Sequence, residues 1–146
     1  MNHYSKETFF RPTQSVGFLI NKARNILTVE MDAALKDLDI SSQQMGILMS
    51  LALGEAATPF ELSKALGIDT GLMTRMLDKL EAKELLQRSR SLEDRRVVNL
   101  TLTKKGEEVA AQVPEVAPNV LNAHLKNFNK AEFEELRRLL RKFLDE

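Results

Sequence analysis

Residues 94–106 read DRRVVNLTLTKKG, a segment that contains a charged turn, a strand and the start of a helix. Its charged residues come first, as at the tip of a hairpin, and then Val98, Leu100 and Leu102 alternate with polar residues at the period of a half-buried strand. Thr103 supplies a hydroxyl that can cap a helix. A basic turn that returns into a core-facing strand favours contact with a polyanion over covalent chemistry. The segment therefore predicts the wing of a winged DNA-binding protein.

The composition suits one mostly α-helical domain. The chain has 146 residues, of which 43% are hydrophobic and only 5% are aromatic, which favours helix-on-helix packing. Cysteine is absent, which excludes disulfides, thiolate zinc sites and thiol-based redox sensing. No apolar run is long enough to span a bilayer, and the first eleven residues lack the apolar core of a signal peptide. We therefore expect a cytoplasmic protein without a membrane partner.

Basic residues are concentrated in one part of this neutral chain. Residues 70–105 contain nine basic and five acidic side chains, a net charge of +4, and the remainder of the chain carries −4. A chance fluctuation in a solvated surface would also produce such a window. Together with the expected wing, however, it indicates a positive surface confined to the segment that would contact nucleic acid.

Two short helices are predicted immediately before the wing. Thr58 is a capping residue, Pro59 suits the first helical position and Glu61 the third, and this helix should end at Gly67. After a short turn Asp69 caps a helix that is expected to run to about residue 83. Two short helices joined by a tight turn that contains glycine form a helix-turn-helix.

Longer amphipathic helices are predicted before this motif. Apolar residues recur at helical spacing over residues 14–39, and a helix of that length exceeds what a small lobe can cover. Part of its face is therefore expected to pack against another subunit. Ser41 and Gln44 form a capping box at the start of the following helix, which should end near Gly54.

The chain after the wing is also predicted to be helical. A helix should begin at Thr103 and continue through Val113, where Pro114 and Pro118 predict a break or kink before helix resumes at residues 119–128. A last helix should follow the capping pair Asn129 and Glu132. Its apolar stripe consists of Phe133, Leu136, Leu139, Leu140, Phe143 and Leu144.

These residues resemble the MarR (multiple antibiotic resistance regulator) family over nearly the whole chain. The segments LSKALG at 62–67 and TRMLDKL at 74–80 resemble its DNA-reading helices. The family's wing pattern, D-x-R-x-x-x-L-x-L-T-x-x-G, is matched by Asp94, Arg96, Leu100, Leu102, Thr103 and Gly106. The resemblance implies one winged helix-turn-helix lobe, residues 40–103, and dimerisation helices at 1–39 and 104–146. It implies a homodimeric transcriptional regulator, a repressor, that binds a palindromic operator in double-stranded DNA.

Glu84 departs from the family pattern, in which glycine commonly lies between the recognition helix and the strand. A residue with a Cβ is strained in a left-handed helix cap. We therefore expect the chain to leave this helix by a different route.

The candidate DNA contacts lie on the recognition helix and the wing. Thr74 and Arg75 are placed to meet base edges, and Thr70 or the adjacent amides could hold a phosphate. By resemblance, Arg95 or Arg96 enters the minor groove while Asp94 fixes an arginine through a charge-assisted hydrogen bond. Five further basic residues are expected to contact either backbone phosphates or only solvent: Lys79, Arg88, Arg90, Lys104 and Lys105.

Members of the family often respond to small aromatic or lipophilic acids, so the resemblance implies an effector such as an aromatic carboxylate. Arg11 or Arg24 could pair with its charge. The apolar walls could come from Phe9, Phe10, Phe18 and Met45. Ordinary packing or solvation is the simpler role for each of these residues.

Other classes of function find less support in the residues. His3 and His124 are the only histidines, so a zinc site or a histidine-based triad would require unsupported pairings. There is no glycine-rich phosphate loop, and we expect neither catalytic residues nor a metal or cofactor. The alternative is a winged-helix module that binds another protein and leaves its basic wing solvated.

Overall fold

The computed structural model describes residues 1–9 and 11–146 and has the predicted mostly α fold with one antiparallel hairpin. The elements, in chain order, are α1 (Lys6–Phe9), η1 (Pro12–Gln14), α2 (Val16–Ala34), η2 (Lys36–Leu38), α3 (Ser42–Ala52), α4 (Pro59–Leu66), α5 (Thr70–Ala82), β1 (Leu86–Arg90), β2 (Val98–Leu102), α6 (Lys104–Leu125) and α7 (Lys130–Phe143).

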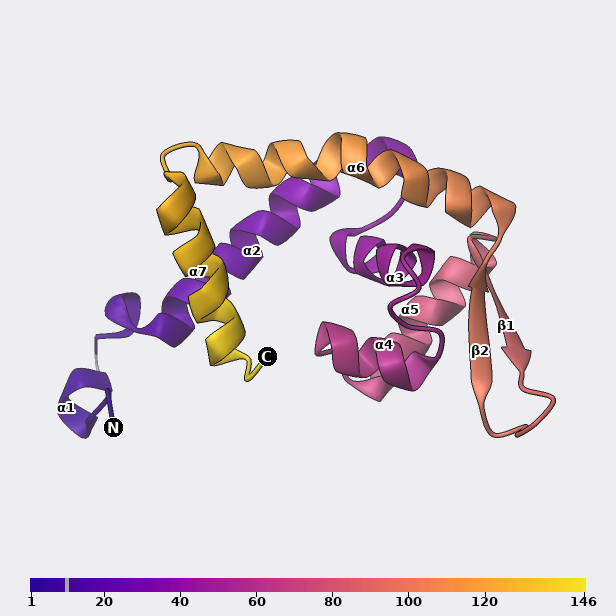
Figure 1. Cartoon of the computed structure of the whole chain (residues 1–146), viewed down its shortest axis with the longest axis horizontal. Coiled ribbons are helices and arrows are strands. Elements are labelled where there is room, and N and C mark those ends of the chain that lie inside the picture. Colours follow the sequence, from indigo (N-terminus) through magenta and orange to yellow (C-terminus); the bar gives the residue numbers. More distant parts are fainter. Residues whose placement is uncertain (10) are drawn as a thin grey trace.

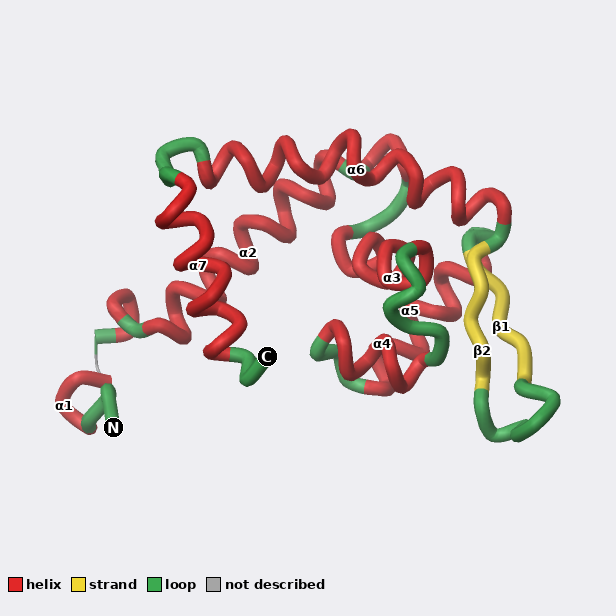
Figure 2. Tube along the Cα trace, in the orientation of Figure 1, coloured by secondary structure: helices red, strands yellow, loops and turns green. Residues whose placement is uncertain are grey.

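Helix α6 spans most of the molecule and connects its two ends (Figure 1). At one end α3, α4 and α5 form a compact lobe, and the β1–β2 hairpin projects from this lobe on the side far from α7 (Figure 2). The buried core lies within the lobe and also receives Met31 of α2, Leu35 just after this helix, and Val113 in the middle of α6. The arrangement matches the predicted winged helix-turn-helix.

The predicted helix starts form as expected. Ser41 Oγ accepts a hydrogen bond from Gln44 N (3.1 Å) while Gln44 Oε1 accepts one from Ser41 N (3.1 Å), which completes the capping box of α3. The hydroxyl of Thr58 caps α4 and the carboxylate of Asp69 caps α5. Gly67 joins α4 and α5 in the left-handed conformation, with φ of 63°, which glycine adopts without steric cost.

The two wing strands pair in an antiparallel register that places apolar residues opposite each other at their inner end. Leu86 lies opposite Leu102, and Leu100 is buried while its polar neighbour Thr101 is exposed. The lobe contributes one further backbone contact, because Leu100 N donates to Ala57 O (2.8 Å) in the segment between α3 and α4. The hairpin is therefore attached to the helix-turn-helix through its inner strand.

The N-terminal region differs from the prediction in its boundaries. The helix expected over residues 14–39 begins only at Val16, because Ser15 caps it by accepting from Phe18 N (3.0 Å). It ends at Ala34, and the tighter turn η2 then brings Ile40 into the core. The short helices α1 and η1 were not predicted, since four and three residues are too few to show a helical period.

Of the break or kink expected at the two prolines, the break is wrong. Helix α6 is continuous from Lys104 to Leu125 and contains both Pro114 and Pro118. An internal proline costs a helix about 3 kcal/mol because it removes a donor and crowds the preceding turn. Ala110 and Val113 are buried on this helix, and the packing of its apolar face offsets that cost.

The expectation for Glu84 is also wrong, because Glu84 does adopt the left-handed conformation, with φ of 60°. Glu84 N donates to Glu81 O (2.9 Å) and Leu85 N donates to Leu80 O (3.0 Å), as in a glycine-capped helix end. The carbonyl of Glu84 also accepts from Thr103 Oγ1 (2.5 Å). Tertiary contacts thus hold a residue with a Cβ in a strained conformation.

Glu84→Gly is expected to raise the free energy of unfolding by about 1 kcal/mol, because it removes the left-handed strain. Urea denaturation followed by circular dichroism measures the change. Glu84→Ala is the control, because it removes the carboxylate but keeps the Cβ and should give no comparable gain. Equal stabilisation by both variants would show that charge, rather than backbone strain, is the cause.

Candidate nucleic-acid interface

Helix α5 presents a polar face to solvent. Met73, Met76, Leu77 and Leu80 are buried against the lobe. The opposite face is exposed and contains Thr70, Thr74, Arg75, Asp78 and Lys79. The hydroxyl of Thr74 donates to Thr70 O (2.9 Å), so its lone pairs remain available to an incoming donor.

Arg75 and Lys79 lie one helical turn apart on this face. Among the residues that the structure describes, neither side chain forms an ion pair or a hydrogen bond. Their donors are therefore free, and the spacing suits an Arg75 guanidinium directed at base edges and a Lys79 ammonium directed at a phosphate.

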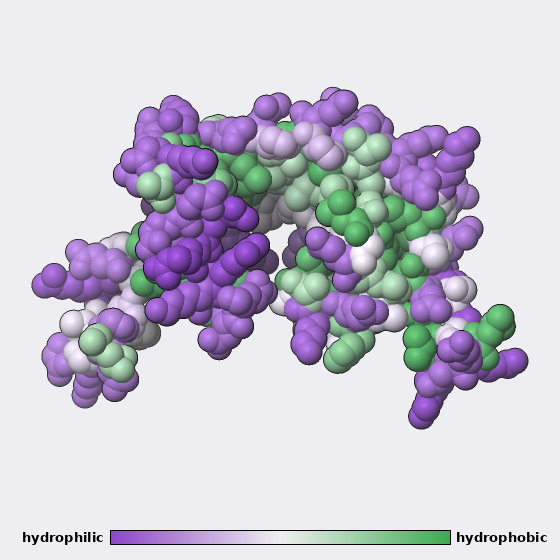
Figure 3. All heavy atoms as spheres, in the orientation of Figure 1, coloured by the Kyte–Doolittle hydropathy of each residue, from purple (hydrophilic) through white to green (hydrophobic). Residues whose placement is uncertain are grey.

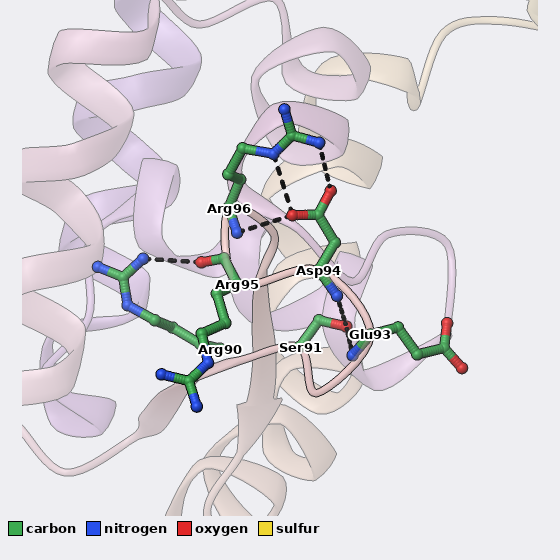
Figure 4. Close-up of polar contacts among 6 residues, drawn as sticks. All are labelled: Arg90, Ser91, Glu93, Asp94, Arg95 and Arg96. Carbon is green, nitrogen blue, oxygen red and sulfur yellow. Dashed lines mark hydrogen bonds and ion pairs between the residues drawn. The ribbon is translucent and has the colours of Figure 1, made fainter.

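The wing turn holds Arg96 in one position. Arg96 Nε donates to Asp94 Oδ1 (3.1 Å) and Arg96 Nη2 donates to Asp94 Oδ2 (3.1 Å), a bidentate pair shown in Figure 4. Asp94 Oδ1 also accepts from Arg96 N (3.0 Å). These hydrogen bonds from Arg96 hold the pKa of Asp94 below its ordinary value. The Arg96 side chain nevertheless remains 91% exposed.

Other polar contacts order the remainder of the turn. Arg90 Nη1 donates to Arg95 O (2.8 Å), and Ser91 Oγ accepts from the backbone amides of Glu93 (3.2 Å) and Asp94 (3.4 Å). Figure 4 shows the guanidinium groups of Arg95 and Arg96 on opposite sides of the turn. The wing is thus ordered by its own residues, with two arginines directed outward.

Arg88 is engaged within the protein. Its Nη2 donates to Asp78 Oδ1 (2.7 Å) and its Nε donates to Glu81 Oε2 (2.6 Å), so it ties β1 to the outer face of α5. Hydrogen bonds to Asp78 and then to Glu81 raise the pKa of Arg88. The sequence predicted a phosphate contact or solvation here and gave no sign of these two partners, which come from a different element.

Two lysines of the basic segment at residues 70–105 also have partners within the protein. Lys83 Nζ donates to Asp39 O (2.6 Å), and Lys105 Nζ donates to Lys83 O (3.1 Å). Lys104, in contrast, has no side-chain partner within the described part of the chain. Residues 70–105 therefore contain free cations on α5, in the wing and at the start of α6, together with cations that hold the lobe together.

Asp94 gives the wing a defined dependence on pH. Because its pKa is depressed in the folded wing, the Asp94–Arg96 pair is expected to persist at neutral pH and to be lost only as pH falls through that depressed pKa, on the acid side of an ordinary aspartate titration. Carbon-13 NMR of the Asp94 carboxyl follows the titration. Arg96→Ala should move its midpoint back towards the ordinary value, whereas Arg95→Ala should not. A midpoint that is indifferent to Arg96→Ala would contradict the pairing.

The candidate effector residues are not gathered in one place by a single chain. Arg11 lines a hollow beside His3, Tyr4 and Glu7, and this hollow does not include Met45, which packs against the lobe core. Phe18 and Arg24 are exposed on α2. Phe10 and the side chain of Phe9 lie outside the described residues.

The other candidate chemistries receive no new support. Within residues 1–9 and 11–146, no group of three His, Cys, Asp or Glu side chains is arranged to hold a metal ion. His124 Nε2 lies 2.6 Å from Glu30 Oε2 and connects α6 to α2, in keeping with a structural role. None of the described helices is both long and apolar enough to cross a membrane.

Comparisons with known proteins agree with this geometry. A model of the MarR family matches residues 40–98. The multiple antibiotic resistance protein MarR of Escherichia coli K12 is 32% identical over 141 residues, 96% of this chain and 98% of that protein. A crystal structure of a mutant of E. coli MarR with operator DNA, 30% identical, superposes with a TM-score of 0.82 over 97% of this chain and 99% of that one. Bordetella bronchiseptica BpsR, 23% identical, has the same fold, with a TM-score of 0.81 over 99% of each chain. The chain belongs to the MarR family of DNA-binding transcriptional regulators.

Proposed function

We propose that this regulator is a homodimeric repressor that binds a palindromic operator, with α5 in the major groove and the wing in the adjacent minor groove. The observation that carries this proposal is the ordered wing, in which Asp94 holds Arg96 in place while leaving it 91% exposed. Ordering an arginine before binding reduces the conformational entropy lost on DNA.

On the recognition helix, Arg75 reads a base edge, Thr74 supplies a neighbouring polar contact, and the start of α5 at Thr70 receives a phosphate. Lys79 contacts the backbone one turn further along. In the wing, Arg96 enters the minor groove and Arg95, on the opposite side of the turn, meets a phosphate. Arg88 and Arg90 act indirectly, by holding the wing against α5 and ordering its turn.

Dimerisation uses the segments 1–39 and 104–146. No residue of α7 is buried within one chain, although this helix carries an apolar stripe. The face of α7 that Figure 3 presents is hydrophilic, so the apolar stripe lies on another side. On α2, Val16, Leu19, Ile26 and Val29 are also exposed. Apolar surface of this extent is typical of a subunit interface.

The effector is a small aromatic or lipophilic acid. The structure of B. bronchiseptica BpsR is described as a mechanism for regulation of DNA binding by 6-hydroxynicotinic acid, an aromatic carboxylate. Arg11 and Arg24 are two cations on the N-terminal side of this chain that could pair with such an anion. The acid weakens operator binding only in so far as it binds the free dimer more tightly than the DNA-bound dimer.

A salt-titrated binding assay tests the DNA-binding surface. Arg75→Ala is expected to weaken operator binding about 10- to 100-fold and to relax base preference at one position, because a bidentate base contact is lost. Arg96→Ala is expected to weaken binding as well. Fluorescence anisotropy on a duplex selected from a randomised library measures both effects.

Arg141→Ala, which removes an exposed arginine from α7, is the control and should bind like the wild type. Wild-type binding that shows no preference among duplexes, or that stays unchanged in Arg75→Ala and Arg96→Ala, would overturn the proposed function.

A further inference from the structure

The C-terminal end of the recognition helix α5 is attached to the segment that follows α2. Lys83, the residue that caps α5, donates from Nζ to Asp39 O (2.6 Å) and to Gln44 Oε1 (3.3 Å), and its ammonium lies 3.8 Å from Asp39 Oδ1. The side chain of Lys83 is 32% exposed, and Gln44 is buried. A single ammonium thus joins α5 to the junction between α2 and α3.

The same end of α5 is attached to the start of α6. Lys105 Nζ donates to Lys83 O (3.1 Å), and Thr103 Oγ1 donates to Glu84 O (2.5 Å). Gly106 packs so closely on Leu85 O that a Cβ would overlap this oxygen. The end of the recognition helix is therefore a junction where both long helices, α2 and α6, meet the lobe.

The contacts of Lys83 separate it from the cations that face solvent. An ammonium has three donors, and Lys83 uses two of them in hydrogen bonds to Asp39 O and Gln44 Oε1, while the Asp39 carboxylate lies at ion-pair distance. Lys79, one turn earlier on the same helix, has no such partner within the described residues. Charge-assisted hydrogen bonds from a partly buried ammonium resist rotation of the helix that carries it.

We propose that Lys83 is a positioning residue that fixes the tilt of α5 relative to α2 and α6, and thereby the spacing between the two recognition helices of the dimer. This inference rests on the proposed function, a dimer on a palindrome. Successive major grooves on one face of DNA are about 34–36 Å apart, so the tilt of each lobe determines which half-site separation the dimer accepts. Lys83 contributes to specificity without touching DNA.

The test compares Lys83→Met with the wild type on a palindromic duplex selected by the wild type from a randomised library. Two further duplexes carry one base pair inserted or deleted at the centre. The wild type is expected to prefer the selected spacing at least 10-fold, and Lys83→Met should reduce that preference to a few-fold. The slope of log K against log salt should be unchanged, because no phosphate contact is lost. Lys83→Arg should restore much of the preference.

Lys79→Met is the matched control on the same helix. It should reduce the salt slope by about 0.9 and keep the spacing preference, as expected for one phosphate contact. If Lys83→Met behaves in this way instead, Lys83 is a phosphate contact and the inference is overturned. A wild type that selects no duplex overturns the proposed function itself, and this role of Lys83 with it.

A second measurement requires no DNA. The chain has no cysteine, so Leu92→Cys at the exposed wing tip provides a single site for a spin label. The label-to-label distance distribution in the dimer should be broader in Lys83→Met than in the wild-type background, while thermal melting shows that both are folded. Identical distributions in two folded proteins would overturn the positioning role.

Discussion

Gly106→Ala is expected to lower the free energy of unfolding by about 3 kcal/mol or more, the combined cost of severe overpacking and of one weakened backbone hydrogen bond. A Cβ on residue 106 would overlap the carbonyl oxygen of Leu85, which already accepts from Thr103 N (3.1 Å). The clash involves backbone on both sides, so no side chain can rotate to relieve it. Urea denaturation followed by circular dichroism measures the loss.

Gly46→Ala is the matched control, since residue 46 lies within α3 and a Cβ there would meet Leu66 Cδ2 at an ordinary 3.5 Å. Alanine should stabilise this helix by about 0.5–1 kcal/mol relative to glycine. Two glycines in one chain are thus expected to respond to the same change with opposite signs. If Gly106→Ala were as stable as the wild type, the close contact between α6 and the end of α5 would be wrong.

Leu140→Glu is expected to weaken the dimer at least about 1000-fold, because an unpaired carboxylate buried in an apolar interface costs on the order of 4 kcal/mol or more. The residue is 41% exposed in one chain and belongs to the apolar stripe of α7, where Leu139, Phe143 and Leu144 are exposed further. Sedimentation equilibrium over a range of protein concentrations measures the dissociation constant.

Lys142→Glu places a carboxylate on the polar side of the same helix and should leave the dimer intact. Operator binding should be lost in Leu140→Glu at concentrations where its dimer dissociates, and should be retained in Lys142→Glu. A wild-type chain that sediments as a monomer at micromolar concentration would contradict the dimer, whatever its DNA affinity.

The parts of the fold that depend on neighbouring residues could be predicted from the sequence. The caps at Ser41, Thr58 and Asp69 form because each side chain accepts from the backbone amide three residues further along the chain. The two errors at α6 and Glu84 have one physical origin. The intrinsic conformational preferences of the residues disfavour proline inside a helix and a glutamate with positive φ. In both cases tertiary packing outweighs these preferences.

The candidate interface was predictable to a similar degree. Sequence spacing identified the exposed face of α5 and the charged turn, and resemblance indicated that Asp94 holds an arginine, which the structure shows to be Arg96. The hydrogen-bond partners of Arg88 and Lys83 could not be predicted, because the sequence shows which residues are charged but not which of them lie close together in the fold. The count of basic residues at 70–105 is therefore larger than the number of cations that are free to contact DNA.

The hydrogen bond from Leu100 N to Ala57 O has a consequence for folding. The β1–β2 hairpin joins nearby residues and can form early, whereas this bond closes a loop over the whole helix-turn-helix and must wait until that motif has docked. Its amide should therefore exchange with deuterium only through global unfolding, while amides at the wing tip exchange through local opening. Recognition helix and inner wing strand would be lost together, as one cooperative unit.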